Sequence, residues 1–389
     1  MIKGQQITVL GAGIGGLTAA VALAQRGADV TVLERAPEIS EVGAGLQISP
    51  NGVRVLDALG LGDTARRRAM RGRGVWLRDG VSGREVIDFA FDNVAPDATF
   101  LLFHRADLID LLAEAAQSAG AKIRCGVTVR AVKPTRADPL VEIEGDAPCS
   151  MGFVVGADGL HSVLRPALNG VRKPVFTGQV AWRAVVPATG REQAEATIFM
   201  GPGRHMVTYP LRDGSLINIV AVEERSAWAD EGWNHTDDPE NLRRAFSAFC
   251  DDAQALLERV DRVHLWGLFR HPVALEWHRG HTALLGDAAH PTLPFMAQGA
   301  VMAIEDAYVL ANCLDSEGPE QGPALYQALR RPRVERIVEA ANKNARNYHY
   351  ANPLARRVGH GALRLAGRLA PQKVFGRFGW IYNADVTRP

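Results

Sequence analysis

The pattern of apolar and polar residues near the start of the chain predicts a strand, a helix and a second strand. Residues 7–10 and 30–33 are short apolar runs typical of buried strands. Between them, apolar residues recur at helical spacing from residue 14 to residue 24, and Gly27 follows as a C-terminal glycine. This order predicts the first βαβ unit of an α/β fold.

In the middle of the chain the pattern changes to an alternation of polar and apolar residues, which is typical of antiparallel strands. Helical stretches interrupt it near residues 240–249 and 253–260, and shorter strand-like runs occur earlier, within 74–91 and 99–103. These segments predict an antiparallel layer inserted into the α/β unit. Its strands are expected at 180–186, 196–200, 205–211, 216–222 and 263–268.

Two further apolar runs end close to an aspartate. Residues 153–155 and 283–285 are each followed by a glycine and then by Asp158 and Asp287 respectively. In an open α/β sheet the ligand contacts lie at the carboxyl ends of the strands, so both aspartates are candidate ligand-binding residues. The alternative is a pair of structural turns, because Asp and Gly are common turn residues.

The segment after Asp287 predicts an anion site. Pro294 stiffens the loop, and a helix then begins at Gln298, Gly299 and Ala300. The first N–H groups of a helix have no partner within it, and they bind anions readily. The alternative is a Gly/Pro-rich surface connection that leads into a core helix.

Composition limits the classes of function. The chain has 389 residues, enough for two domains, with 47% hydrophobic residues and a net charge of +1, which gives no indication of a nucleic-acid partner. Its 4 cysteines form no CxxC or Cys/His cluster, so neither a metal site nor a disulfide framework is indicated and a reducing cytoplasm is expected. No apolar run has the length of a signal peptide or a membrane span.

The last part of the chain carries an apolar stripe among basic residues. No acidic residue occurs from position 340 to position 384. We predict a basic amphipathic helix here. Its apolar side either covers its own domain, which is the usual arrangement, or contacts anionic lipid or a partner subunit in a homodimer. The stripe consists of Leu354, Val358, Ala362, Leu365 and Leu369.

The residues after the first strand form a dinucleotide-binding motif. Gly11, Gly13 and Gly16 follow the strand directly, and Glu34 ends the second strand, 18 residues beyond the last glycine. In this motif the first glycine makes the turn, the second admits a pyrophosphate and the third packs the helix on the strand. The acid binds a ribose hydroxyl. Because all these parts occur in order, a nucleotide site is favoured over a structural loop.

Three motifs together resemble the single-component FAD-dependent aromatic hydroxylases, the group that contains salicylate hydroxylase, 3-hydroxybenzoate 6-hydroxylase and 6-hydroxynicotinate 3-monooxygenase. The motifs are GAGIGG with Glu34, GADGLHSVLR at 156–165 and GDAAHPTLPFMAQGA at 286–300, and the resemblance covers nearly the whole chain. It implies a Rossmann-like FAD-binding domain with an inserted antiparallel substrate domain and a C-terminal helical tail. The implied boundaries are 1–73, 101–171 and 273–350 for the FAD-binding domain, 74–100 and 172–272 for the substrate domain, and 351–389 for the tail.

The resemblance also implies which residues hold FAD, with NADH or NADPH as a co-substrate that has no domain of its own. Reduced flavin carries negative charge, which the N–H groups at the start of the helix at 299 would stabilise. In the family pattern, Arg105 and Asp158 lie near the pyrophosphate and Asp287 near the ribityl or phosphate region. The full set of implied cofactor residues is Gly11, Gly13, Gly16, Glu34, Arg35, Arg105, Asp158, Asp287, Gly299 and Ala300.

A phenolic substrate reacts best as its phenolate, so a base is expected beside it. A free phenol has a pKa of about 10 and a free histidine about 6.5, which makes histidine a suitable acceptor. His205 and Tyr209 are four apart, on one face of a predicted strand. We interpret His205 as the base and Tyr209 as its partner or a ring contact; the alternative is a core histidine. The resemblance adds Gln47 to the substrate pocket and the Pro294 carbonyl as acceptor for the substrate hydroxyl.

We therefore expect an FAD-dependent monooxygenase that hydroxylates a small phenolic acid, such as a salicylate or hydroxybenzoate, using NAD(P)H and O2. Two alternatives stay open. One is a flavin monooxygenase of the same fold that acts on an N-heteroaromatic or non-phenolic substrate. The other is a catalytically inactive FAD-binding protein with a regulatory or membrane-surface role.

Overall fold

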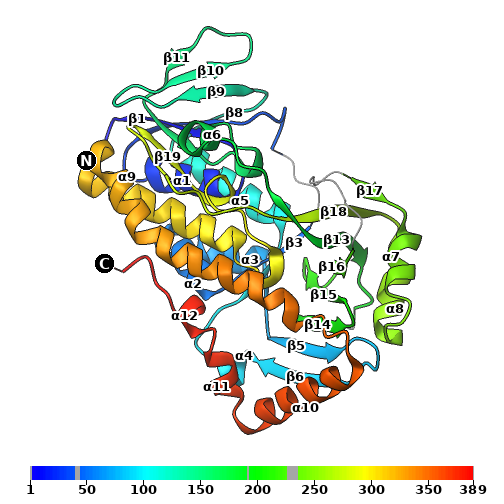
Figure 1. Ribbon diagram of the computed structural model, residues 1–389. Helices are drawn as coiled ribbons and strands as arrows, with labels where there is room; N and C mark the ends of the chain where they lie inside the picture. Colours follow the sequence, from blue (N-terminus) through cyan, green and yellow to red (C-terminus); the bar gives the residue numbers. More distant parts are fainter. Residues whose placement is uncertain (1, 40–43, 191, 226–234, 389) are drawn as a thin grey trace.

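A five-stranded parallel sheet carries the nucleotide motif (Figure 1). The computed structural model describes residues 2–39, 44–190, 192–225 and 235–388, without the side chains of 344–347. The strand order β19-β12-β1-β2-β8 brings together strands that are far apart in the sequence, so the loops after β1, β12 and β19 share one edge. The strands are β1 (Gln6–Leu10), β2 (Asp29–Leu33), β8 (Lys122–Arg124), β12 (Phe153–Gly156) and β19 (Thr282–Leu284).

Three helices pack around this sheet. Helix α1 (Ile14–Ala24) contacts both α5 (Arg105–Ser118) and α9 (Gly299–Asn347). All residues of α1 except Gly15 are buried, because the sheet and the two helices enclose it. Helix α9 contains a non-helical residue, Gly318, with φ of 75°, so it consists of two helical parts.

A separate eight-stranded sheet has the order β17-β18-β13-β16-β15-β14-β5-β6. Its neighbours are antiparallel except β14 and β5, which run parallel. Helices α7 (Pro239–Ala245) and α8 (Asp251–Glu258) cover one face, where Phe246 packs against the buried Trp182 (Figure 1). The sheet thus forms the antiparallel layer that the sequence predicted. Its strands are β5 (Gly74–Asp79), β6 (Glu85–Ala90), β13 (Val175–Pro187), β14 (Glu195–Gly201), β15 (Arg204–Leu211), β16 (Leu216–Glu224), β17 (Thr236–Asp237) and β18 (Val263–Arg270).

The remaining elements are short. A three-stranded sheet of order β3-β7-β4 contacts α2 through β3. A second one, of order β11-β10-β9, lies beyond β8 of the parallel sheet (Figure 1). These elements are β3 (Gly45–Ile48), α2 (Pro50–Ala58), α3 (Gly62–Arg68), β4 (Met70–Arg71), α4 (Phe91–Val94), β7 (Leu101–His104), β9 (Val129–Lys133), β10 (Leu140–Ile143), β11 (Cys149–Ser150), α6 (Leu164–Asn169) and the 3₁₀ segments η1 (Gly159–His161), η2 (Gly286–Ala288) and η3 (Pro294–Met296).

The C-terminal tail forms three helices, α10 (Pro353–Leu369), α11 (Pro371–Gly376) and α12 (Gly379–Tyr382). Helix α10 packs on β6, where a Cβ added to Gly367 would lie 2.4 Å from Ile87. The expectation that its apolar stripe covers its own domain is wrong, because four members are 59% to 76% exposed. The helix turns the side with Gly367 and His360 to the sheet instead, where Gly367 meets Ile87 of β6 and His360 pairs with Asp79 of β5 at 3.1 Å. The exposed members are Leu354, Val358, Leu365 and Leu369.

Candidate active site

The glycine loop after β1 is fixed by contacts that leave no room for side chains at two positions. Gly11 has φ of 97°, and a Cβ there would lie 2.7 Å from the Ala157 oxygen. A Cβ at Gly16 would lie 2.0 Å from the Gly11 oxygen, so Gly16 packs α1 directly on the loop. Gly13 differs, since a Cβ there would meet nothing within 4 Å and the residue opens onto a cavity. The loop therefore presents bare backbone to that cavity.

Two carboxylates border the same part of the cavity. Glu34 accepts hydrogen bonds from the Ala12 N–H at 2.7 Å and the Ala36 N–H at 2.9 Å, which orients it toward the glycine loop. Asp158 accepts from the Val163 N–H at 2.8 Å through Oδ2. Its Oδ1 is buried and has no hydrogen-bond partner among the described residues, and burial raises the pKa of this carboxyl. A buried oxygen without a partner is costly unless a ligand donates to it.

Asp287 enters the cavity from the loop after β19. Its side chain is exposed into the cavity, while the surrounding protein raises its pKa and the charges of His290 and Arg105 oppose that shift. Arg105 begins α5, and Arg35 follows Glu34; both line the cavity. The edge of the parallel sheet thus gathers these charged residues at one place.

A buried ionic network fixes this loop to α9. Asp306 accepts from the Gly286 N–H at 3.1 Å and pairs with His290 and with the Nε of Arg330 at 2.8 Å. Burial alone would raise the pKa of Asp306, but His290 and Arg330 outweigh it and hold the pKa at about 2. Arg330 also pairs with Glu305 at 2.7 Å. The network therefore holds the turn that carries Asp287 against the first half of α9.

The start of α9 faces the cavity. The Met302 N–H donates to the Gln298 oxygen at 2.8 Å, so the N–H groups of Gly299 and Ala300 precede the helical hydrogen bonds. Both residues line the cavity. The Gln298 side chain donates to Ser49 Oγ at 2.9 Å, which joins the start of α9 to the segment before α2. This arrangement presents a helix N-terminus to any bound anion.

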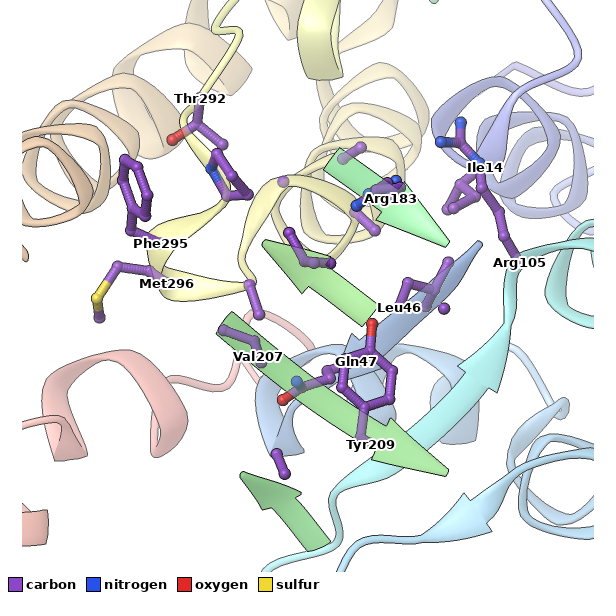
Figure 2. Close-up of a pocket in the computed structure, with 18 of the residues that line it drawn as sticks. Ile14, Leu46, Gln47, Arg105, Arg183, Val207, Tyr209, Thr292, Phe295 and Met296 are labelled. Carbon is purple, nitrogen blue, oxygen red and sulfur yellow. The ribbon is translucent and has the colours of Figure 1, made fainter. Parts of the chain in front are cut away.

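The other end of the cavity is one face of the eight-stranded sheet. Cross-strand pairing aligns a row of side chains on that face, and every member of the row lines the cavity. The loop between β19 and α9 supplies the opposite wall, with Thr292, Phe295 and Met296 (Figure 2). The whole cavity measures about 1070 Å³, and it is continuous from the glycine loop to the sheet. The row consists of Arg183, Val220, Val207, Ile198 and Leu77.

His205 lies in the next row of this face. It is 2% exposed, packs against Phe295 with 5.6 Å between ring centres, and lines the cavity. Its Nδ1 is 2.7 Å from Nε2 of His349, and Nδ1 of His349 is 2.8 Å from a carboxylate oxygen of Glu224. Burial, and then the charge of His349, lower the pKa of His205 well below its ordinary value.

Tyr209 shares the face of His205 but is not its hydrogen-bond partner through Nδ1, a position taken by His349. The physical reason is distance, because four residues of strand span roughly 13 Å. The Tyr209 ring packs over Gly45 instead, where an added Cβ would lie 2.6 Å from it. Burial raises the pKa of Tyr209, and the charge of nearby Arg183 opposes that shift.

Gln47 and Pro294 also line the cavity. Gln47 belongs to β3, and Pro294 begins η3. The Pro294 oxygen accepts from the Ala297 N–H at 3.1 Å, which leaves one lone pair for a further donor. Every predicted site residue therefore borders one cavity, except Gly16, which packs behind the glycine loop.

Comparison with known proteins places this architecture in a family. The FAD binding domain model matches residues 5–341. The chain is 35% identical over 399 residues to 3-hydroxybenzoate 6-hydroxylase of Polaromonas naphthalenivorans (strain CJ2), with 98% of this chain and 96% of that protein covered. The chain belongs to the FAD-dependent aromatic hydroxylase family. It is a flavin monooxygenase, and FAD is its cofactor.

Two further matches show the range of this hydroxylase family. The chain is 34% identical to the 3-amino-4-hydroxybenzoate 2-monooxygenase of Streptomyces cremeus, with 88% of each covered. The structure of HpxO from Klebsiella pneumoniae, complexed with FAD and uric acid, superposes with a TM-score of 0.81 at 26% identity, covering 94% of each chain. The mixed α/β fold with a Rossmann-like domain and an antiparallel layer is therefore confirmed.

The residues of the hydroxylase fit FAD. Gly13 leaves bare backbone beside open space, Asp158 offers a buried acceptor without a partner, and the start of α9 offers N–H donors at the middle of the cavity. A bound dinucleotide with an anionic pyrophosphate and an extended flavin would occupy the open space and supply hydrogen-bond partners to these groups.

Two site residues were not identified from the sequence as functional. Arg183 belongs to no motif in the sequence, and its cavity position depends on the pairing of β13 with β16. His349 lies two residues beyond the end of α9 and 144 residues from His205, so no local pattern signals their contact. The spacing of alternate residues on β15 could have identified only the face, not the partner.

Proposed function

We propose that this hydroxylase adds one oxygen atom to the ring of a small phenolic acid, with NADH or NADPH as reductant and O2 as co-substrate. The observation that carries the proposal is the single continuous cavity, which joins the FAD end to a sheet face bearing His205, Tyr209 and Arg183. An apolar row on that face suits an aromatic ring, and a cation suits its carboxylate.

When bound, FAD supplies the hydride acceptor and the oxygen chemistry. We infer that Gly11, Gly13 and Glu34 hold its dinucleotide part, and that the N–H groups of Gly299 and Ala300 stabilise negative charge at its ring end. Arg35, Arg105, Asp158 and Asp287 complete the cofactor set. The chain's own work is then to bind the substrate, orient it and exclude water.

Substrate recognition follows from the sheet face in this proposal. Arg183 is half-buried, with its guanidinium carbon 5.1 Å from the centre of the Trp266 ring, so it is rigidly placed to pair with a carboxylate. His205 takes the proton of the ring hydroxyl, Tyr209 contacts the ring, and Gln47 and the Pro294 oxygen bracket it. A hydroxyl that loses its proton makes the ring a better nucleophile.

The test is a screen of hydroxylated aromatic acids for faster oxidation of NADH and NADPH by the yellow holoprotein. We expect hydroxybenzoates to stimulate oxidation and to gain one labelled atom from ¹⁸O2. Uric acid and hydroxynicotinates belong in the same screen, because the similarity to HpxO favours a heteroaromatic ring as the second candidate. Stimulation only by the heteroaromatic acids would replace the phenolic proposal with that candidate.

We also propose that the hydroxylase works in the cytoplasm, where reduced nicotinamide is available. The cysteines Cys125, Cys149, Cys250 and Cys313 are all free, which suits a reducing compartment. Among the described residues, no helix combines the length and the apolarity needed to cross a membrane.

The exposed stripe of α10 suggests contact with a membrane surface. Arg357 and Arg368 flank Leu354 and Leu365 on the helix, and the absence of acids from 340 to 384 in the sequence favours an anionic lipid surface as the occupant. Sedimentation with phosphatidylserine vesicles is expected to retain the wild type and to lose a Leu354→Ser/Leu365→Ser variant. A dimer in the absence of lipid, dissociated by the same substitutions, would assign the stripe to a homodimer interface instead.

A further inference from the structure

Three polar side chains form a hydrogen-bonded line from the cavity to the surface. His205 on β15 meets His349, which follows α9, with 2.7 Å between Nδ1 and Nε2. His349 meets Glu224, at the end of β16, with 2.8 Å between Nδ1 and Oε1. The side chain of His349 is 1% exposed and that of Glu224 is 51% exposed. The line therefore begins in a buried wall of the cavity and ends in water.

The chemistry at the surface end fixes the positions of the protons. An ionised carboxylate only accepts, so the Nδ1–H of His349 donates to Glu224. The Nε2 of His349 then accepts from the Nδ1–H of His205. In neutral His205 this leaves Nε2 as the unprotonated nitrogen. The tautomer that can take a proton in the cavity is thus selected by Glu224, through His349.

We propose that His205, His349 and Glu224 form a proton relay that carries the substrate's hydroxyl proton from the cavity to solvent. This inference rests on the proposed function. One proton binds at Nε2 of His205, the Nδ1 proton of His205 moves to Nε2 of His349, and the Nδ1 proton of His349 moves to Glu224, which releases it to water. One proton enters and one leaves, and no electrons move. Protonation of the product reverses the steps and restores both tautomers.

The surroundings of His205 favour a relay over a single base. Phe295 and Tyr348 pack against its ring, with 5.6 and 5.1 Å between ring centres, so a charged imidazolium there would lose most of its hydration. Burial lowers the pKa of His349, the hydrogen bond and charge of Glu224 oppose that shift, and the charge of Arg204 adds to it. When the proton moves on to His349, His205 does not stay charged. The negative partner of the relay, Glu224, lies at the solvent-exposed end.

The test measures whether a bound phenol ionises. The probe is 3-hydroxybenzoate, or the isomer that best stimulates NADH oxidation, and its phenolate is followed by ultraviolet difference spectra of the holoprotein between pH 5 and 10. In Glu224→Gln and His349→Gln we expect the pH of half-ionisation to rise by at least one unit. We expect kcat for hydroxylation to fall at least tenfold, with KM within twofold. Benzoate, which has no hydroxyl, is expected to bind all forms equally.

Two controls separate the relay from structural effects. Glu195→Gln removes a carboxylate from β14 of the same sheet and is expected to leave the pH of half-ionisation unchanged. Glu224→Asp keeps a carboxylate and is expected to recover part of kcat. Flavin spectra and melting temperatures report on folding, and Glu224 is exposed enough for Glu224→Gln to fold.

The outcomes distinguish the two proposals. If the wild type neither ionises a hydroxybenzoate nor oxidises NADH faster with one, the proposed function fails. If the wild type does both, and Glu224→Gln and His349→Gln show the wild-type pH of half-ionisation, the relay is overturned while the function stands.

Discussion

Replacing Arg330 by methionine should expose how much of the fold depends on the buried network behind the cofactor loop. Arg330 is 1% exposed and pairs with Glu305 at 2.7 Å and Asp306 at 2.8 Å, both of them fully buried. Removing one partner of a buried ion pair costs about 3–5 kcal/mol, because the remaining charge is left uncompensated. Such a loss is a large share of the roughly 5–15 kcal/mol that stabilises a typical domain.

The neighbouring Arg331 is a matched control. Its side chain is 29% exposed and pairs with Glu335 at 2.9 Å, so Arg331→Met should cost less than about 1 kcal/mol. Urea unfolding of the holoprotein, followed by tryptophan fluorescence at pH 7, measures both apparent free energies of unfolding. Flavin fluorescence should also show weaker FAD binding in Arg330→Met, since Asp306 holds the Gly286 turn.

The effect of pH has a definite sign. Burial would raise the pKa of Asp306, but His290 and Arg330 lower it from 3.8 to about 2. Because the folded pKa lies below the unfolded one, this stabilisation is present above pH 4 and is lost as the pH falls toward 2. In Arg330→Met, burial raises the pKa of Asp306 with one less opposing charge. The difference in free energy of unfolding between the wild type and Arg330→Met should therefore shrink as the pH is lowered from 7 to 5. Equal losses of unfolding free energy in Arg330→Met and Arg331→Met would refute the reasoning, and so would a loss in Arg330→Met that does not change with pH.

Three other substitutions test the site. Gly16→Val should give protein without bound flavin, because its Cβ would lie 2.0 Å from the Gly11 oxygen, and absorbance at 450 nm after purification checks this. Glu34→Ala should raise the Kd for FAD about tenfold, or about 1.4 kcal/mol, through loss of the acceptor that orients the loop, as measured by flavin fluorescence titration. Arg183→Leu should raise KM about tenfold for hydroxybenzoates but not for phenols without a carboxylate; an equal rise for both in steady-state assays would remove Arg183 from carboxylate recognition.

The cofactor half of the fold could be predicted from local sequence. Gly11, Gly13 and Gly16 act within a few residues of each other, and Glu34 follows after one helix, so short-range spacing is enough to define their arrangement. The ends of β12 and β19 were also predictable, because each is an apolar run that stops at a glycine followed by an aspartate, and ligand contacts in an open α/β sheet lie at the carboxyl ends of its strands.

The substrate half depends on long-range pairing, which periodicity does not encode. The alternation on β15 placed His205 and Tyr209 on one face, but only the arrival of the segment after α9 gives His205 its partner. For helix α10, the apolar pattern predicted the wrong side of the helix as the buried one. Its apolar positions predicted a buried side, yet β6 receives the side with Gly367, because a helix without a side chain there can approach closely.

The row of side chains from Arg183 to Leu77 has a consequence for how such enzymes diversify. Each of its five members comes from a different strand, and backbone hydrogen bonds, not side chains, hold those strands together. A mutation in the row can therefore reshape the wall against the ring while the glycine loop and the Asp306 network stay intact. Substrate preference can drift by single steps at these positions while the reductive and oxygen-handling machinery is inherited unchanged.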